Sequence, residues 1–338
     1  MRGPPPNEHL GQVSIALPTG VTVLERGWLS SNNIVFDDGD VVSIVDTGYV
    51  LHAEQTAQLI DRVRGERGLT RIINTHLHSD HVGGNALLAQ RHGAPITMPA
   101  GLATAVRAWD VDALTYAPTG QQCPRFDYSA LLHDGDVLTL GGAPWQVLAA
   151  PGHDPHMVML WQPDDGVLIT ADALWENGFG AIFPEIEGES GFDEQRAALD
   201  LIAAHAPRLV IPGHGAPFAD VPAALERASA RLAALSASPA RNARHVAKVL
   251  IKFWLLQVRT STRTQLLAWT GAARYFGVIH ERYFADAPFA QMIDRAVDEL
   301  VAAGAANRDR HESDDETDDQ TDDDTAKDTD HETICNVD

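Results

Sequence analysis

The stretch 74-NTHLHSDHVGG-84 holds three histidines and an aspartate within six residues, at His76, His78, Asp80 and His81. Each neutral imidazole has one donor and one acceptor nitrogen that need partners, so histidines this dense rarely serve only to fill space. A divalent metal ion satisfies several acceptor nitrogens at once. Because the stretch continues the strand-like segment RIINT (71–75), it predicts a metal site at the end of a β-strand.

Three further residues of the same chemical types follow predicted strands later in the chain. His153 lies in APGHDPH (150–156), Asp172 ends GVLITAD (166–172), and His214 lies in PGHG (212–215). Strand ends at one sheet edge bring side chains from distant parts of a sequence into one cleft. We therefore expect these residues to join the first four.

The combined set supplies more donors than one metal ion needs. A structural zinc takes four ligands, usually with thiolates among them. Five imidazoles and two carboxylates without a cysteine predict two catalytic divalent ions, with Zn²⁺ preferred and iron or manganese as alternatives. The predicted ligands are His76, His78, Asp80, His81, His153, Asp172 and His214.

The first 220 residues alternate between strand-like and helix-like segments, which predicts an α/β (α+β) fold of sheets covered by helices. The predicted helices are 53–68, ending at Gly68, and 85–93 and 192–205. The predicted strands are 41–47, 71–75, 136–140, 145–151, 158–162, 166–172 and 207–213.

Charge and periodicity divide the chain into unlike parts. Residues 1–221 hold 11 Lys and Arg against 27 Asp and Glu, whereas 222–310 hold 13 against 7. We predict an N-terminal extension (1–10), a catalytic domain (11–221) and a C-terminal helical domain (222–306) whose end resembles a winged-helix unit. The last part (307–338) holds 1 Lys against 13 acidic residues from 311 on, so we expect a disordered tail that hydrolysis does not need.

Residues 10–220 resemble the metallo-β-lactamase fold superfamily. The resemblance rests on four motifs: H-x-H-x-D-H, a P-G-H loop, a strand-ending Asp and a final P-G-H-G. The resemblance implies an αββα sandwich of two mixed β-sheets. It assigns His76, His78 and His153 to a first metal, Asp80, His81 and His214 to a second, and Asp172 to a bridge between them. Asp46, in VDTG, matches a position behind the metals that orients a ligand.

Asp172 also bears on the reaction. The zinc β-lactamases of this superfamily usually carry Cys or Ser there, whereas the Asp bridge is typical of glyoxalase II, acyl-homoserine lactonases, other thioesterases and certain ribonucleases. We therefore expect a hydroxide between the metals to attack a small ester or thioester, with Asp80 and Asp172 as the catalytic residues. The P-G-H loop continues Asp154-Pro155 rather than T-x-G, which argues against a glutathione thioester as the substrate.

Two alternatives remain open on the sequence. The helical C-terminal part resembles the branch of the human mitochondrial endoribonuclease, and Arg241, Arg244, Lys248 and Lys252 would form a basic helix face for a polyanion such as RNA or the phosphates of coenzyme A. The acidic catalytic part would repel a phosphate backbone, so nucleic acid is the weaker expectation. The other alternative is a mononuclear iron persulfide dioxygenase.

The substrate pocket is predicted from the loop that follows Asp172 and from one histidine. His156, Trp175, Phe179 and Phe183 are the candidate substrate contacts. The segment 101–130, with Trp109, Tyr116, Arg125 and Phe126, is a candidate lid over the cleft.

Composition limits where such a protein works. The sequence contains no run of about 18 apolar residues, which a membrane-spanning helix would need. The two cysteines, Cys123 and Cys335, give no disulfide or metal pattern, and 1–10 lack the apolar part of a signal peptide. We expect a cytoplasmic protein with no membrane partner, and the sequence makes no prediction of oligomeric state.

Overall fold

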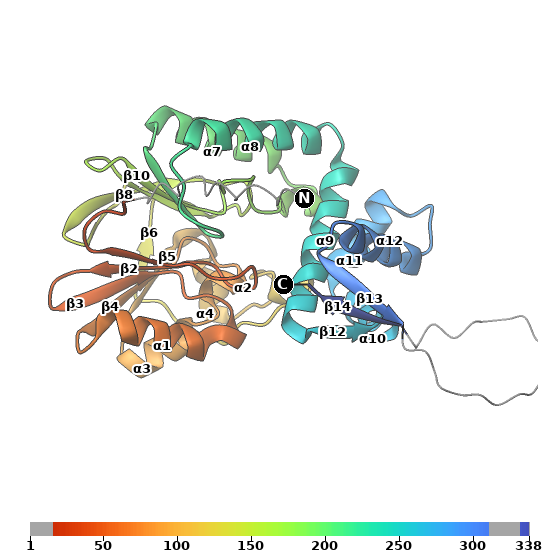
Figure 1. Cartoon of the computed structure of the whole chain (residues 1–338), viewed down its shortest axis with the longest axis horizontal. Coiled ribbons are helices and arrows are strands. Elements are labelled where there is room, and N and C mark those ends of the chain that lie inside the picture. Colours follow the sequence, from red (N-terminus) through yellow and green to blue (C-terminus); the bar gives the residue numbers. More distant parts are fainter. Residues whose placement is uncertain (1–15, 311–331, 338) are drawn as a thin grey trace, which may run out of the picture.

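Two mixed β-sheets packed face to face form the centre of the computed structural model, which describes residues 16–310 and 332–337 (Figure 1). The predicted N-terminal extension (1–10) lies outside these residues. The first sheet has the order β1-β2-β3-β4-β5-β6 and the second the order β11-β10-β9-β8-β7, each with parallel and antiparallel pairs.

The strands of the first sheet are β1 (Val21–Leu24), β2 (Asn33–Asp37), β3 (Val41–Val45), β4 (Gly68–Ile73), β5 (Ile96–Pro99) and β6 (Ala130–Leu132). Those of the second sheet are β7 (Val137–Leu140), β8 (Ala143–Ala149), β9 (Val158–Gln162), β10 (Val167–Ala171) and β11 (Leu209–Pro212). Apolar side chains of both inner faces, among them Phe36, Ile73, Trp145 and Ile169, make the core between the sheets.

Helices cover both outer faces, so the predicted αββα layers are confirmed. Figure 1 shows α1 (Ala53–Arg64) and α3 (Asn85–His92) below the first sheet, and α7 (Phe192–His205) and α8 (Val221–Ser236) above the second. α1 ends earlier than predicted, because Gly65 takes a left-handed φ of 60° and Gly68 already begins β4. α8 packs against α7, and the predicted domain boundary at 221/222 stays a prediction.

Shorter helices lie in the connections between these elements. They are η1 (Val50–His52), α2 (Ser79–Val82), η2 (Ala100–Leu102), α4 (Ala103–Ala108), α5 (Tyr116–Thr119) and α6 (Pro184–Glu187). α2 carries the second half of the histidine-rich stretch directly behind β4.

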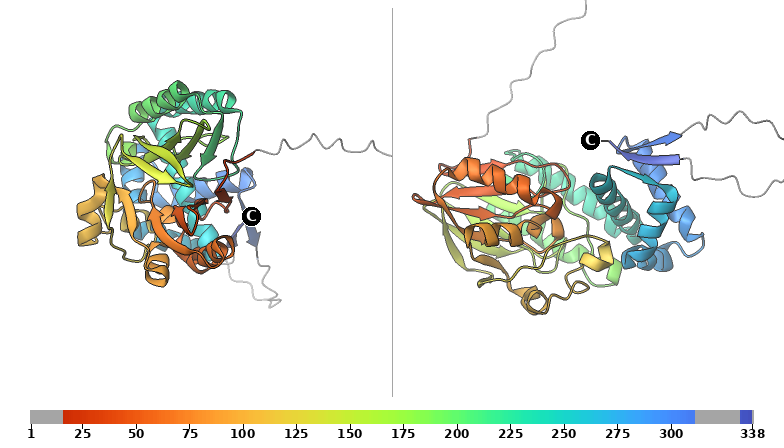
Figure 2. Two further views of the ribbon diagram at one scale, coloured as in Figure 1. Left: turned by 90° about the vertical axis from the view of Figure 1, so that its left-hand side faces the viewer. Right: turned by 90° about the horizontal axis from the view of Figure 1, so that it is seen from below.

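A second unit of helices and a small sheet sits at one end of the sandwich (Figure 2). It comprises α9 (Pro239–Val258), α10 (Arg263–Ala272), α11 (Arg274–Tyr283), α12 (Phe289–Ala302), β12 (Thr260–Thr262), β13 (Ala306–Arg310) and β14 (Glu332–Asn336). The long helix α9 runs past the open end of both sheets (Figure 1).

The acidic tail was expected to be disordered from residue 307, and this is wrong for both of its ends. β14 pairs with β12 on one side and with β13 on the other, and Ile334 is buried in the core of the second unit. An isolated five-residue strand carries too little apolar surface to be recognised behind an acidic run. Residues 311–331 lie outside the described part of the chain.

Among the described residues, no helix combines the length and the apolar character that crossing a membrane requires.

Candidate metal centre

The seven predicted ligands come together at one edge of the sandwich. The stretch 76–81 follows β4, Asp172 follows β10 and His214 follows β11, while His153 lies in the loop between β8 and β9. Ligand atoms group as His76–His78–His153, His76–His81–Asp172 and Asp80–His81–His214, with the atoms of each group within 4.8 Å of one another.

Asp172 stands between the two sets of imidazoles. Its Oδ1 lies 3.5 Å from His81 Nε2, and its Oδ2 lies 3.4 Å from His153 Nε2. Its side chain is only 5% exposed. Oδ2 also lies 3.9 Å from His214 Nε2, so this carboxylate is within reach of both sets.

The first set presents nitrogen atoms to one another at short range. His78 Nδ1 lies 2.8 Å from His153 Nε2 and 3.1 Å from His76 Nε2. One proton can satisfy only one pair of these atoms, whereas a cation at their centre satisfies all three lone pairs.

Neighbouring acceptors fix which ring nitrogen stays free. His81 Nδ1 donates to Asp46 Oδ2 at 2.8 Å, and His153 Nδ1 donates to the carbonyl of Ala181 at 2.5 Å. Their Nε2 atoms are then unprotonated in the neutral ring, which is the form that binds metal. His81 Nε2 is fully buried and has no hydrogen-bond partner among the described residues.

The backbone and neighbouring hydrogen bonds hold the Asp46 carboxylate in position to accept from His81. Asp46 follows β3 with a left-handed φ of 57°, and its carboxylate also accepts from the Thr75 backbone N–H at 2.9 Å and the Thr75 hydroxyl at 2.7 Å. The family resemblance predicted this position behind the metals, and the hydrogen bond to His81 is consistent with that prediction.

Two glycines keep the backbone close to the ligands. A Cβ at Gly213 would overlap Asp172 Oδ1, and a Cβ at Gly180 would overlap His153 Nδ1. No larger residue fits at either position without moving a predicted ligand.

Burial and charge set the protonation states. Burial lowers the pKa of His78 and of His153 to about 4 each, and that of His76 well below its ordinary value. Burial would raise the pKa values of Asp80 and Asp172, but His81 and His214 hold both below the ordinary value. At neutral pH these imidazoles are free bases and these carboxylates are ionised, as metal binding requires.

The pKa of His81 shows that negative charge surrounds its ring. Burial lowers its pKa, but the carboxylates of Asp172, Asp46 and Asp80 outweigh burial and hold the pKa well above its usual range. The surroundings thus favour a positive charge beside this ring. The orphaned nitrogen, the donor set and the negative field together fit divalent cations.

Only two of the four predicted substrate residues reach the cleft above these ligands. Trp175 and Phe183 line it, and Phe183 packs edge-on against His78 with ring centroids 5.3 Å apart. Phe179 is wholly buried in the core under α8, and His156 is exposed, with its ring against Gly101. A loop aromatic or histidine alone gives no direction, so sequence could not separate these cases.

Other residues that line the cleft were not predicted. Trp28, which is 58% exposed, stacks on the His214 ring with centroids 5.5 Å apart and contacts Trp175 edge-on. α9 contributes Val249 and Phe253. Nothing in the local sequence indicated that Trp28 or α9 would reach the cleft.

The predicted lid segment is mostly structural. Tyr116 and Phe126 are buried, and Trp109 packs on both of them. The same segment nevertheless brings Thr119 and Gln121 to the cleft. Its function as a moving lid stays a prediction.

The predicted basic face of α9 is partly neutralised. Arg244 and Lys248 both contact Glu299 of α12, at 3.7 and 2.9 Å. Lys252 binds the carbonyls of Ala305 and Val337 and the side chain of Asn336.

Comparison with known proteins agrees with this geometry. Residues 26–214 match the sequence profile of the metallo-beta-lactamase superfamily. A hydroxyacylglutathione hydrolase of Idiomarina loihiensis is 31% identical over 147 residues, which are 44% of this chain and 47% of that protein. One of Methylococcus capsulatus is 33% identical over 120 residues, 36% of this chain and 39% of the relative. The chain thus spans half of the length of these two relatives or less.

A third relative is matched over more of its length. Hydroxyacylglutathione hydrolase GloC of Haemophilus influenzae is 27% identical over 196 residues, which are 54% of this chain and 84% of that protein.

Solved structures share the fold. A beta-lactamase domain protein of Burkholderia ambifaria has a TM-score of 0.54 and 20% identity, and the match covers 95% of this chain and 94% of the other. A metallo-beta-lactamase family protein of Thermus thermophilus has a TM-score of 0.51 and 22% identity, covering 87% of this chain and 97% of the other.

Proposed function

Because the chain belongs to the metallo-beta-lactamase superfamily, we propose that it is a binuclear metal-dependent hydrolase of small thioesters. The observation that carries the proposal is Asp172, whose carboxylate lies between both sets of buried imidazoles, 3.4 Å from His153 and 3.5 Å from His81. His76, His78 and His153 would hold one ion, and Asp80, His81 and His214 the other, with Asp172 shared.

Two such cations, when bound, lower the pKa of water and offset negative charge that develops on an acyl oxygen. Zn²⁺ is the preferred ion for this donor set, with iron and manganese as alternatives.

The chain's own residues position the substrate and handle its protons. Trp28 and Trp175 pack against the His214 ring and form an apolar wall of the cleft. The Trp175 indole N–H donates to Asp172 Oδ1 at 3.2 Å and holds that carboxylate in place. Asp80 has 15% of its side chain exposed at the cleft, so its free oxygen can take the proton of the attacking water and pass it to the leaving thiolate.

A small thioester agrees with the cleft and with the relatives. The cleft over the ligands holds only about 90 Å³, enough for a short acyl group. The relatives are hydroxyacylglutathione hydrolases, and a thiolate leaves more readily near neutral pH than an alkoxide does. Lactones and oxygen esters are therefore the weaker part of the same proposal.

The alternatives have less support. Glu299 already pairs with two residues of the basic face that a nuclease would use. A mononuclear dioxygenase needs one site, whereas Asp80, His81 and His214 form a second complete group.

The test is metal content per chain measured beside turnover of acetyl N-acetylcysteamine thioester, for wild type, Asp172→Ala and the surface control Asp193→Ala. We expect about two metals per chain and thioester turnover in wild type and control. In Asp172→Ala we expect the metal content and the turnover both to be lost. One iron per chain with oxygen uptake and no thioester turnover would refute the proposal.

A further inference from the structure

An apolar groove leads away from the metal cleft. It holds about 360 Å³ and shares Trp28, Trp175, Ala181, Val249 and Phe253 with the cleft, so the two spaces adjoin. Its walls are mainly apolar. Of its cationic lining residues, Lys252 binds the carbonyls of Ala305 and Val337, and Arg231 and Lys248 also line the next space. A ligand whose reacting carbon lies at the metals therefore meets mainly apolar surface in the groove, which favours an uncharged segment.

The groove in turn opens into a basic pocket. This second space holds about 420 Å³ and shares Arg231, His245 and Lys248 with the groove. Arg241 and Arg244 also line it, and Glu299 is its one acidic lining residue. Four cationic side chains against one carboxylate leave a positive balance.

Part of this charge has no internal counterion. Within residues 16–310 and 332–337, no carboxylate lies within 4.0 Å of the guanidinium groups of Arg231 or Arg241. Arg231 donates instead to His245 Nε2 at 2.7 Å. That ring nitrogen accepts, so His245 is neutral and adds no charge.

The separation between the two ends follows from α9. Val249 lines the cleft and Arg241 the basic pocket, and eight residues of α-helix rise by about 12 Å. Glutathione places its carboxylates close to the sulfur and carries charge where the groove is apolar. An anion at the end of a longer neutral arm matches the groove and the pocket together.

We propose that the thioester substrate carries its sulfur on a neutral arm that ends in a phosphate, the chemistry of phosphopantetheine and coenzyme A. This inference rests on the proposed thioester hydrolysis. The acyl group would occupy the cleft, the arm the apolar groove, and the phosphate the pocket around Arg231 and Arg241. Hydrolysis breaks the acyl C–S bond, forms a C–O bond to water, and releases the carboxylate, the free thiol and one proton.

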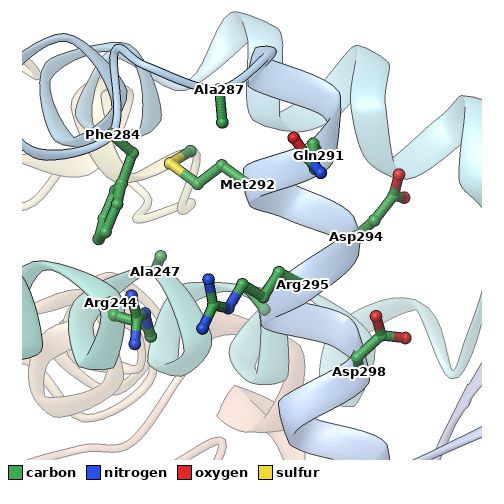
Figure 3. A pocket seen from close by; sticks show the side chains of 10 residues that line it. Arg244, Ala247, Phe284, Ala287, Gln291, Met292, Asp294, Arg295 and Asp298 are labelled. Carbon is green, nitrogen blue, oxygen red and sulfur yellow. The ribbon is translucent and has the colours of Figure 1, made fainter.

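A further pocket shares Arg244 with the basic pocket but lies outside the cleft and the groove. It holds about 490 Å³ between α9 and α12, where Phe284 and Met292 face one another above Arg244 and Arg295 (Figure 3). Asp294 and Asp298 point away from its centre in that view and pair with Arg263 and Arg308. It contains no residue of the metal cleft.

The test uses one acetyl group on four thiols: N-acetylcysteamine, pantetheine, phosphopantetheine and coenzyme A. We expect kcat/KM to rise about tenfold or more between pantetheine and phosphopantetheine, and this step to weaken at high salt. Arg241→Glu should remove most of the step while leaving the pantetheine thioester unchanged. Arg196→Glu, an exposed charge reversal on α7, is the matched control.

The outcomes are separable. Equal rates on pantetheine and phosphopantetheine, or a phosphate step that survives Arg241→Glu, would overturn this inference while leaving thioester hydrolysis intact. Absence of turnover on all four thioesters by metal-loaded protein would instead refute the proposed function. Acetylated acyl carrier protein as a fifth substrate distinguishes a carrier-bound arm from free coenzyme A.

Discussion

Replacing Asp46 by Asn tests whether the site depends on one hydrogen-bonding proton. Asp46 Oδ2 accepts from His81 Nδ1 at 2.8 Å, which leaves His81 Nε2 free for a metal. An Asn side chain has almost the same shape but can place an N–H₂ group where the carboxylate oxygen was. His81 then either faces donor to donor or moves its proton to Nε2 and accepts from the amide. In the second case the ring no longer offers a lone pair to the metal.

The size of the effect follows from the cost of an unpaired buried donor. His81 is fully buried, so keeping its metal-binding tautomer opposite an amide costs roughly 1–3 kcal/mol. At about 1.4 kcal/mol per factor of ten, the second metal should bind roughly 5 to 140 times more weakly. Asp46 reaches the first set only through the Thr75 hydroxyl, which lies 3.1 Å from His76 Nδ1, so the first metal should be affected less than the second.

The assay is competition with a chelator of known affinity, read as metals retained per chain, with thermal unfolding of the metal-free protein beside it. Asp38→Asn is the matched control, because Asp38 precedes the opposite end of β3 and accepts from Ser43 and Gly141. If Asp46→Asn retained both metals with unchanged affinity, the tautomer argument would be refuted. If it lost both together with the folded state, the residue would be structural rather than a positioning residue.

Four further substitutions test the metal site and the rest of the fold. Gly180→Ala should weaken metal binding roughly tenfold or more, because its Cβ overlaps His153, and chelator competition measures this loss. Gly277→Ala lies on α11 with open space around it and should raise the free energy of unfolding by about 0.5–1 kcal/mol, as measured by urea unfolding. Ile334→Ala should lower the free energy of unfolding by about 2–5 kcal/mol, and an unchanged urea midpoint would mean that β14 is not part of the folded core. Burial, with Arg231 and Lys248, lowers the pKa of His245 to about 3, so below about pH 6.5 the unfolded chain binds a proton that the folded chain does not. The free energy of unfolding should therefore fall as the pH drops below about 6.5, by at most about 1.4 kcal/mol per pH unit from this group. His245→Gln should flatten this pH dependence, as measured by urea unfolding.

That the seven candidate ligands would lie close together could be predicted from the sequence, because each one follows a strand. Strand direction and sheet order then decide where its side chain lies, and two parallel pairs, β3 with β4 and β10 with β11, place their carboxyl ends together. The pocket had no such rule. Trp28 comes from the segment before β2 and Phe253 from a helix of the second unit, and both reach the cleft only through tertiary packing. Neither could be placed without the fold.

The C-terminal part illustrates the same limit. Periodicity found α9 and α12 but could not reveal that Glu299 of α12 neutralises two of the basic residues on α9. It also could not reveal that β14 returns across the acidic run to pair between β12 and β13. Long-range pairing of a short strand carries no local signal.

These features make α9 a shared wall rather than an appended helix. One face of α9 gives Val249 and Phe253 to the cleft, and the preceding turns give Lys248, Arg244 and Arg241 to the basic pocket. The ions would be held by the sandwich alone, so a change in α9 should alter substrate choice without altering metal content. A substitution such as Arg241→Glu that changed metal stoichiometry would contradict this division, because it would mean that the second unit is needed to form the metal centre itself.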